Sequence, residues 1–211
     1  MSLLRRDPDP GSGQAEAPPP YQERELKFSL RDPLRPEGSV RPEGQTLDSL
    51  RERLKEAGAQ PKRAAARECN WVFDRRDELF GSSRLLRLRT DGTGCRLTFK
   101  GPPRFEENLK VRDEVEVTVA HAEAMRDLLV RLGYRVVRRY EKVREEWQLA
   151  ATVVALDHTP IGDFVEFEGD DAAAGAERCG FDPRTAERRS YLRLYEDWRR
   201  DHPELPIDMI F

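Results

Sequence analysis

Apolar and polar residues alternate with a period of two along several segments of the chain. Leu26 and Phe28, for example, alternate with Glu25 and Lys27. This period is typical of β-strands, whose successive side chains point to opposite faces. The pattern predicts eight strands, at about residues 21–30, 68–74, 84–91, 94–100, 110–119, 134–149, 152–157 and 164–169.

Other segments repeat their apolar residues at the 3.6-residue spacing of an amphipathic helix. Leucines follow this spacing between Thr46, a favourable N-cap, and Gly58, a favourable stop. A second helix is predicted over about residues 122–132, and a third in the C-terminal part. Asp182 and Pro183 suit the N-cap and first turn of that C-terminal helix.

The connections between most predicted strands are short enough for antiparallel pairing, and eight such strands commonly close into a barrel. We therefore predict an α+β fold, a closed eight-stranded antiparallel β-barrel with flanking helices. Residues 1–20 are rich in Pro, Gly, Ser and Asp and are predicted to be a disordered leader. Residues 31–45 are predicted to be a surface loop, so residues 21–211 form a single domain that includes the C-terminal helix.

Charged residues make up 36% of the 211 residues, yet the net charge is only −3. Acids and bases are mixed, unlike the basic face of a nucleic-acid-binding protein. The three cysteines are scattered, which argues against a disulfide framework. No apolar run has the length of a signal peptide or of a membrane span. These features favour a cytoplasmic protein that binds neither nucleic acid nor membrane.

Many of the charged residues fall on one face of the predicted strands. The acids on that face are Glu23, Glu25, Glu114, Glu116, Asp157, Glu166 and Glu168. The bases are Lys27, Arg87, Arg89, Lys100, Arg112, Lys142 and Arg144. One charged strand face is usually solvated, and ion pairs between strands contribute only ~0.2–1 kcal/mol each. Repetition over every strand instead favours a charged barrel interior, which is costly unless its charges pair or hold a ligand.

The residue types on this face suit a metal ion and a polyphosphate. Carboxylate oxygens bind hard cations such as Mg²⁺ or Mn²⁺, and the histidines and cysteines lack the spacing of zinc ligands. Arginine and lysine bind phosphate oxygens, arginine through two parallel contacts. A triphosphate that arrives with Mg²⁺ requires both kinds of group.

The sequence Glu23-Arg24-Glu25-Leu26-Lys27 resembles the ExExK signature of the CYTH superfamily, the triphosphate tunnel metalloenzymes. Further motifs follow in the family's order: Leu86-Arg87-Leu88-Arg89, Lys100-Gly101-Pro102, Arg112-Asp113-Glu114-Val115-Glu116, Glu141-Lys142-Val143-Arg144, Leu156-Asp157 and the segment 161–168. Together they cover about residues 21–169. The Lys-Gly-Pro step, Leu132-Gly133-Tyr134 and Arg189-Ser190-Tyr191 are most similar to the class IV adenylyl cyclase branch.

The resemblance implies a role for each residue of the charged face. The implied ligands of Mg²⁺ or Mn²⁺ are Glu23, Glu25, Glu166 and Glu168. The implied triphosphate-binding residues are Lys27, Arg87, Arg89, Lys100, Arg112, Lys142 and Arg144. The implied catalytic group is Lys27, Asp157, Glu114 and Glu116.

The resemblance implies a metal-dependent enzyme that acts on a small-molecule triphosphate, either ATP or tripolyphosphate. Its class IV cyclase features predict conversion of ATP to cyclic AMP and pyrophosphate. The alternative is a triphosphatase that hydrolyses tripolyphosphate, thiamine triphosphate or a nucleotide. A hypothesis of another class is a polyphosphate- or nucleotide-binding module without turnover. Relatives include monomers and dimers, so the resemblance is compatible with a homodimer.

Overall fold

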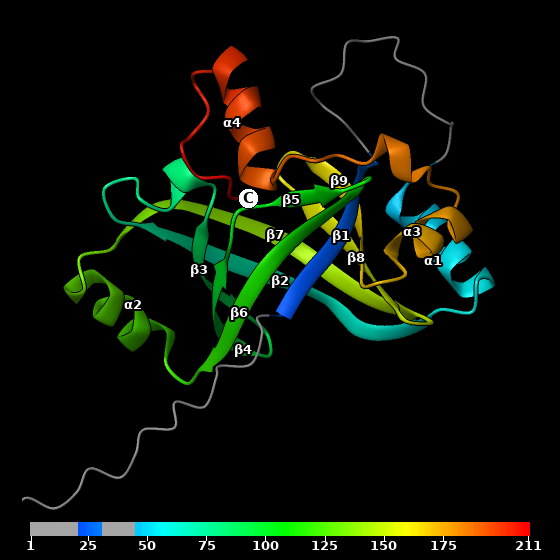
Figure 1. The fold of residues 1–211 in the computed structure, drawn as a ribbon, viewed down its shortest axis with the longest axis horizontal. Helices are drawn as coiled ribbons and strands as arrows, with labels where there is room; N and C mark the ends of the chain where they lie inside the picture. The colour runs from blue at the N-terminus through cyan, green and yellow to red at the C-terminus, as the bar shows by residue number, and fades with distance from the viewer. Residues whose placement is uncertain (1–20, 31–44) are drawn as a thin grey trace, which may run out of the picture.

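The computed structural model describes residues 21–30 and 45–211, which form nine β-strands and four α-helices (Figure 1). The strands are β1 (Tyr21–Ser29), β2 (Gln60–Asp74), β3 (Leu85–Asp91), β4 (Gly94–Lys100), β5 (Arg104–Glu106), β6 (Leu109–Val119), β7 (Arg135–Leu149), β8 (Thr152–Thr159) and β9 (Gly162–Glu168). The helices are α1 (Leu47–Glu56), α2 (Ala122–Arg131), α3 (Ala172–Arg178) and α4 (Tyr191–Asp201), with the short 3-10 turns η1 (Phe80–Ser82) and η2 (Pro183–Thr185). The predicted leader and nearly all of the predicted 31–45 loop lie outside the described residues.

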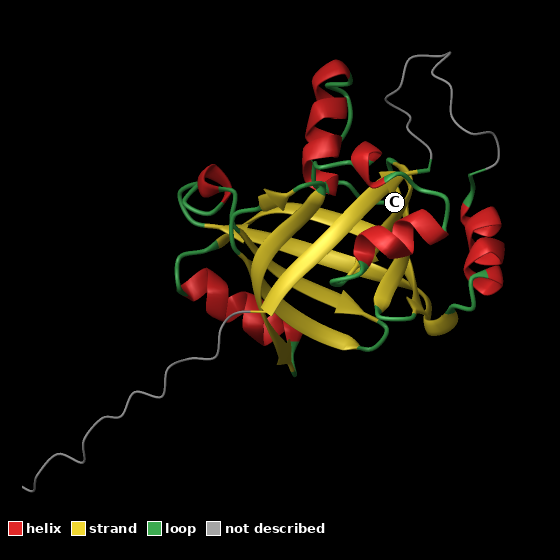
Figure 2. Cartoon of the chain, turned by 45° about the vertical axis from the view of Figure 1, so that its right-hand side comes forward, coloured by secondary structure: helices red, strands yellow, loops and turns green. Residues whose placement is uncertain are grey.

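Eight of the strands close into an antiparallel barrel (Figure 2). Their hydrogen-bonded order is β1-β9-β8-β7-β2-β3-β4-β6, and β6 pairs back with β1. The two partners of β1 are staggered, since residues 21–25 pair with β6 and residues 25–29 with β9. Such a stagger accompanies the strand tilt of a closed barrel. The predicted fold class is therefore confirmed, and β5 adds only a short extra strand beside β6.

Apolar side chains face outward from the barrel, where helices cover much of them. Leu50 and Leu54 of α1 belong to the same buried cluster as Leu26 of β1 and residues of α3. On the other side of the barrel, α2 contributes Leu129 to a cluster with Leu88 of β3 (Figure 1). Because the helices take up the apolar outer face, the interior is left to the charged face of each strand.

The helix boundaries agree with the sequence at α1 and differ at α4. Thr46 and Ser49 form a reciprocal capping box at the start of α1. Asp182 caps only η2, because its side chain accepts the Arg184 N–H and the backbone is extended again by Ala186. The C-terminal helix instead begins after Ser190, whose hydroxyl caps it. The predicted start at Asp182 was therefore wrong.

Three further differences concern elements without a strong period. The structure starts β2 at Gln60, eight residues before the predicted strand, in a mostly exposed polar segment with register shifts against β7. The Ala-rich helix α3 and the three-residue strand β5 were not predicted. Among the described residues, no helix combines the length and apolar character needed to cross a membrane.

Candidate active site

The barrel encloses a charged cavity of about 590 Å³. Of the residues singled out in the sequence, the following line it: Glu23, Glu25, Lys27, Arg87, Arg89, Lys100, Arg112, Glu114, Glu116, Lys142, Arg144, Glu166 and Glu168. The remaining one, Asp157, is completely buried in β8. Strand alternation brings these side chains together, because β1, β3, β4, β6, β7 and β9 each turn a charged face inward.

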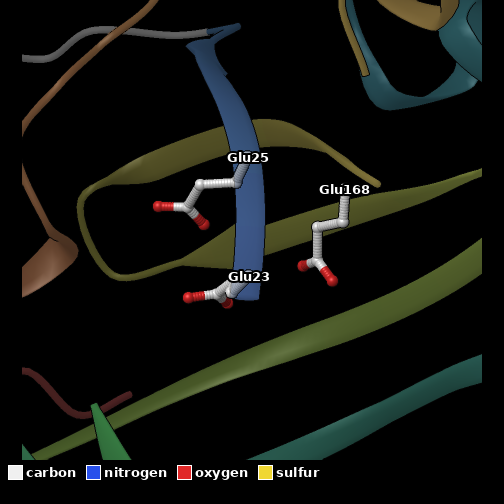
Figure 3. Close-up of side chains that lie close together, drawn as sticks. All are labelled: Glu23, Glu25 and Glu168. Carbon is white, nitrogen blue, oxygen red and sulfur yellow. The ribbon is translucent and has the colours of Figure 1, made fainter. Parts of the chain in front are cut away.

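Three glutamates form an acidic cluster at the wall made by β1 and β9. Glu25 is the register partner of Glu168, and Glu23 lies two residues away on the same face of β1. One oxygen from each of the three carboxylates lies within 4.8 Å of the others (Figure 3). Three converging carboxylates supply only hard oxygen ligands, so the cluster fits Mg²⁺ or Mn²⁺.

The fourth glutamate of the predicted metal group, Glu166, lies against bases instead. Its carboxylate accepts a hydrogen bond from Arg144 and lies 3.9 Å from the Lys27 amine. Burial opposes ionisation of Glu166, but Arg144, Lys142 and Lys27 outweigh it and hold its pKa well below the usual range. The structure thus brings Glu23, Glu25 and Glu168 together and leaves Glu166 as a counter-ion of the basic residues.

The crowding of carboxylates changes the ionisation of Glu168. Burial raises the pKa of Glu168 to about 7; Arg144 works against this rise, whereas Glu23, Glu166 and Glu25 add to it. A divalent cation at this cluster would favour the ionised form of Glu168, since it would offset the repulsion among the three carboxylates.

Asp157 holds Lys142 and Arg144 in place, and we call these two bases and their surroundings the basic wall of the cavity. Its carboxylate accepts hydrogen bonds from Lys142 Nζ at 2.9 Å and from Arg144 Nε at 2.8 Å. The hydroxyl of Tyr191, from the first turn of α4, donates to the same carboxylate at 2.7 Å. Burial, and then the charge of Asp157, raise the pKa of Tyr191 well above its usual value, which keeps this hydroxyl a donor. Asp157 therefore positions two basic side chains and ties α4 to the cavity.

Two buried charged residues of the interior were missed in the sequence. Glu68 of β2 is completely buried, and its carboxylate lies 3.4 Å from Arg89 and 3.8 Å from Lys142. Lys110 of β6 donates to Glu25 at 2.5 Å. Lys110 could have been found by extending the alternation of Arg112 and Glu114 by one step. The segment before Glu68 offers no comparable alternation.

The other two acids of the implied catalytic group also serve as partners of bases. Glu114 lies 3.0 Å from Lys100, whose amine also donates to Glu23 at 2.5 Å. Glu116 accepts a hydrogen bond from Thr98 at 2.9 Å and lies 3.6 Å from Arg89. In this arrangement both acids orient cations of the cavity.

The arginines of the interior differ in how fully they are engaged. Arg112 donates to the backbone carbonyl oxygens of Gly101 at 2.7 Å, Ser83 at 2.9 Å and Lys100 at 3.4 Å. Its guanidinium group thus joins two loops at the rim of the cavity. The buried Nε atoms of Arg87 and Arg89, by contrast, have no hydrogen-bond partner among the described residues. Unpaired buried donors are uncommon, and these two suit an incoming anion.

The family model of the CYTH domain matches residues 70–179, which is more than half of the chain. The chain belongs to the CYTH family. A protein of Methanocaldococcus jannaschii, described as a putative adenylate cyclase, is 31% identical over 84 residues. That match covers 39% of this CYTH chain and 47% of the relative, so it spans about half of the relative's length.

Solved structures share the fold of this CYTH chain. One from Vibrio parahaemolyticus, described as a putative adenylate cyclase, has a TM-score of 0.66 at 20% identity and covers 82% of this chain and 97% of that one. One from Hippeastrum has a TM-score of 0.57 at 17% identity and covers 83% and 96% of the two chains. The Hippeastrum protein is described as a putative adenylyl cyclase with a dominant triphosphatase activity.

Proposed function

We propose that this protein is a divalent-metal-dependent enzyme that acts on a triphosphate bound inside its barrel. The observation that carries the proposal is the meeting of three carboxylates and a surplus of buried bases in one cavity of about 590 Å³. Enzymes of the CYTH family act on triphosphates with a metal ion. The acidic cluster suits the ion, and the basic wall suits the phosphates.

Glu23, Glu25 and Glu168 would hold Mg²⁺ or Mn²⁺. The ion would supply neutralisation of charge on phosphate oxygens. Lys27 of β1, Arg87 and Arg89 of β3, and Lys142 and Arg144 of β7 bind phosphate oxygens from three separate strands of the barrel. Asp157 and Glu68 keep these bases oriented before the substrate arrives. Catalysis then comes from positioning and from preorganised positive charge around the reacting phosphate.

The rim of the cavity favours a triphosphate with an organic end. Phe80, Leu85, Pro103 and Leu192 line the cavity together with its charged residues. These apolar groups have nothing to contact on inorganic tripolyphosphate, whereas they suit a nucleoside. Together with the 31% identity to the protein of M. jannaschii described as a putative adenylate cyclase, this favours ATP as the substrate.

The first reaction we propose is cyclisation. The 3′-oxygen of ATP forms a bond to the α-phosphorus, the bond from that phosphorus to the leaving oxygen breaks, and pyrophosphate departs. The hydroxyl proton is released to solvent. The second candidate is hydrolysis, in which water attacks the terminal phosphorus, the bond from that phosphorus to the bridging oxygen breaks, and orthophosphate departs from the remaining diphosphate. The Hippeastrum protein, described as a putative cyclase with a dominant triphosphatase activity, motivates it.

Product analysis distinguishes these reactions. The full chain is incubated with ATP or with tripolyphosphate, each with Mg²⁺ or Mn²⁺, and products are separated by chromatography. Cyclic AMP and pyrophosphate in equal amounts support the cyclase. Orthophosphate supports the triphosphatase. Absence of product under all conditions, with retained triphosphate binding, would contradict the enzyme and favour a binding module.

A further inference from the structure

Each carboxylate of the acidic cluster already has a cationic partner from the protein. The amine of Lys100 lies 2.5 Å from a Glu23 oxygen, and the amine of Lys110 lies 2.5 Å from a Glu25 oxygen. Glu168 lies 3.3 Å from Arg144. Lys100 and Lys110 are 8% and 9% exposed, so both pairs are shielded from solvent.

An ammonium group and a divalent cation compete for the same carboxylate oxygens. A metal ion that enters the cluster competes with Lys100 for Glu23 and with Lys110 for Glu25. Among the described residues, Lys110 has one counter-ion, Glu25, whereas Lys100 has two, Glu23 and Glu114. Displacing a buried amine from such a carboxylate is costly unless another anion accepts it. Both lysines line the cavity, and the lysine stem is flexible. Phosphate oxygens in the same cavity are therefore the anions that these amines can reach.

We propose that Lys100 and Lys110 are internal counter-ions of the metal carboxylates, and that their transfer to phosphate makes metal binding and triphosphate binding mutually dependent. Metal binding frees the two amines for the triphosphate, and the triphosphate, by holding the amines, leaves the carboxylates to the metal. By linkage each ligand strengthens the other by the same factor. This inference rests on the proposed function and assigns a role to Lys110, which the sequence analysis did not select.

Lys142 provides a matched control. It lines the same cavity and carries the same charge, but its amine lies on Asp157 at 2.9 Å and near Glu68 at 3.8 Å. Neither of these acids belongs to the acidic cluster. Removing the Lys142 charge changes the net charge of the cavity without freeing a metal carboxylate.

The test is a Mn²⁺ titration of the full chain without triphosphate, in which electron paramagnetic resonance measures free Mn²⁺. Lys110→Gln and Lys100→Gln are expected to lower the Kd for Mn²⁺ by at least about fivefold, because the competing amine is gone. Lys142→Gln is expected to change it by less than about twofold. Lys110→Arg, which keeps a cation on Glu25, is expected to stay close to the wild type.

A second measurement addresses the coupling itself. Calorimetry gives the Kd of a methylene-bridged, non-hydrolysable ATP analogue with and without Mn²⁺. The factor by which Mn²⁺ lowers the Kd of the analogue is expected to be smaller in Lys110→Gln than in the wild type. Association of Mn²⁺ with the analogue in solution is the same for every variant, so the difference between variants reports the protein.

The inference is overturned if the wild type and both glutamine variants bind Mn²⁺ equally. It is equally overturned if Lys142→Gln lowers the Kd for Mn²⁺ as much as Lys110→Gln does. Loss of any one positive charge from the cavity would then explain the tighter binding. Circular dichroism checks folding, and Lys100→Gln carries the test if Lys110→Gln does not fold. If neither the wild type nor the glutamine variants bind Mn²⁺, with or without the ATP analogue, the proposed metal site fails, whereas unchanged variants of a Mn²⁺-binding wild type refute only this inference.

Discussion

The cavity has two unlike charged regions, the basic wall around Asp157 and the acidic cluster of Glu23, Glu25 and Glu168. Asp157 is completely buried and accepts hydrogen bonds from three side chains of two elements. In the acidic cluster, two carboxylates each lie 2.5 Å from one lysine, and Glu168 has a raised pKa. A network in which the central carboxylate has several partners is rigid. A carboxylate that is held by one basic side chain, next to other carboxylates, can exchange that side chain for another cation. The basic wall preorganises the cavity. In the acidic cluster, by the inference above, the carboxylates exchange their lysines for a divalent cation.

The largest expected effect is on the stability of the protein and comes from a change in the basic wall. Asp157→Asn leaves Lys142 and Arg144 buried without their main counter-ion, and we expect the free energy of unfolding to fall by ~3–5 kcal/mol. Urea denaturation measures it. Asp127→Asn is the control, because Asp127 pairs with Arg131 on the surface and should cost less than ~1 kcal/mol. Equal losses in the two variants would contradict the contrast.

The next effect concerns the acidic cluster and appears in activity. Glu25→Gln or Glu168→Gln is expected to lower metal-dependent kcat by ~100-fold or more, with folding retained, because a neutral amide is a poor ligand for a hard cation. Steady-state kinetics and circular dichroism measure the two quantities. Glu56→Gln alters an exposed glutamate of α1 and should leave both unchanged. Normal rates in Glu25→Gln and Glu168→Gln together would refute the site.

A smaller effect follows from the ionisation of Glu168. A carboxyl group with a pKa of about 7 is largely protonated at pH 6 and largely ionised at pH 8. Only the ionised form is a good metal ligand, so Mn²⁺ affinity should rise roughly tenfold between pH 6 and pH 8. Mn²⁺ titrations across this range measure the change. The rise should vanish in Glu168→Gln; a rise that persists there would assign the titration to another group.

The smallest effect separates orientation from ligand contact. Glu68→Gln removes the negative charge that lies near Arg89 and Lys142. We expect the KM for the triphosphate to rise by about fivefold with little change in kcat, as for a residue that acts through the phosphate-binding bases. Kinetics at saturating metal measure both values. A loss confined to kcat would place Glu68 at the reacting atoms instead.

Much of this architecture can be predicted from sequence because the charged residues follow the period of two. Lys27, Arg87 and Glu166 each alternate with apolar neighbours, and that alternation fixes which face is inward. Glu68 escapes the same reasoning because the segment before it is Ala- and Arg-rich, without an apolar stripe. The C-terminal helix was misplaced because Asp182 and Pro183 form a good start signal that is used by a single 3-10 turn.

Which charge pairs with which cannot be predicted from the period alone. Glu166 and Glu168 share one face of β9, yet Glu166 contacts Arg144 and Lys27 while Glu168 joins the acidic cluster. That choice depends on the reach of side chains from neighbouring strands. The roles assigned to individual residues, the limits of the domain, the cytoplasmic location and the homodimer stay predictions.

The most direct test of the central claim is a crystal structure with Mn²⁺ and a methylene-bridged ATP analogue. Anomalous scattering locates the ion without assumptions about the site. The account predicts Mn²⁺ among Glu23, Glu25 and Glu168, bound at roughly 2.0–2.3 Å through oxygen, with the phosphates against Arg87, Arg89 and Arg144 inside the barrel. An analogue bound outside the barrel, or Mn²⁺ bound away from these three glutamates, would contradict it.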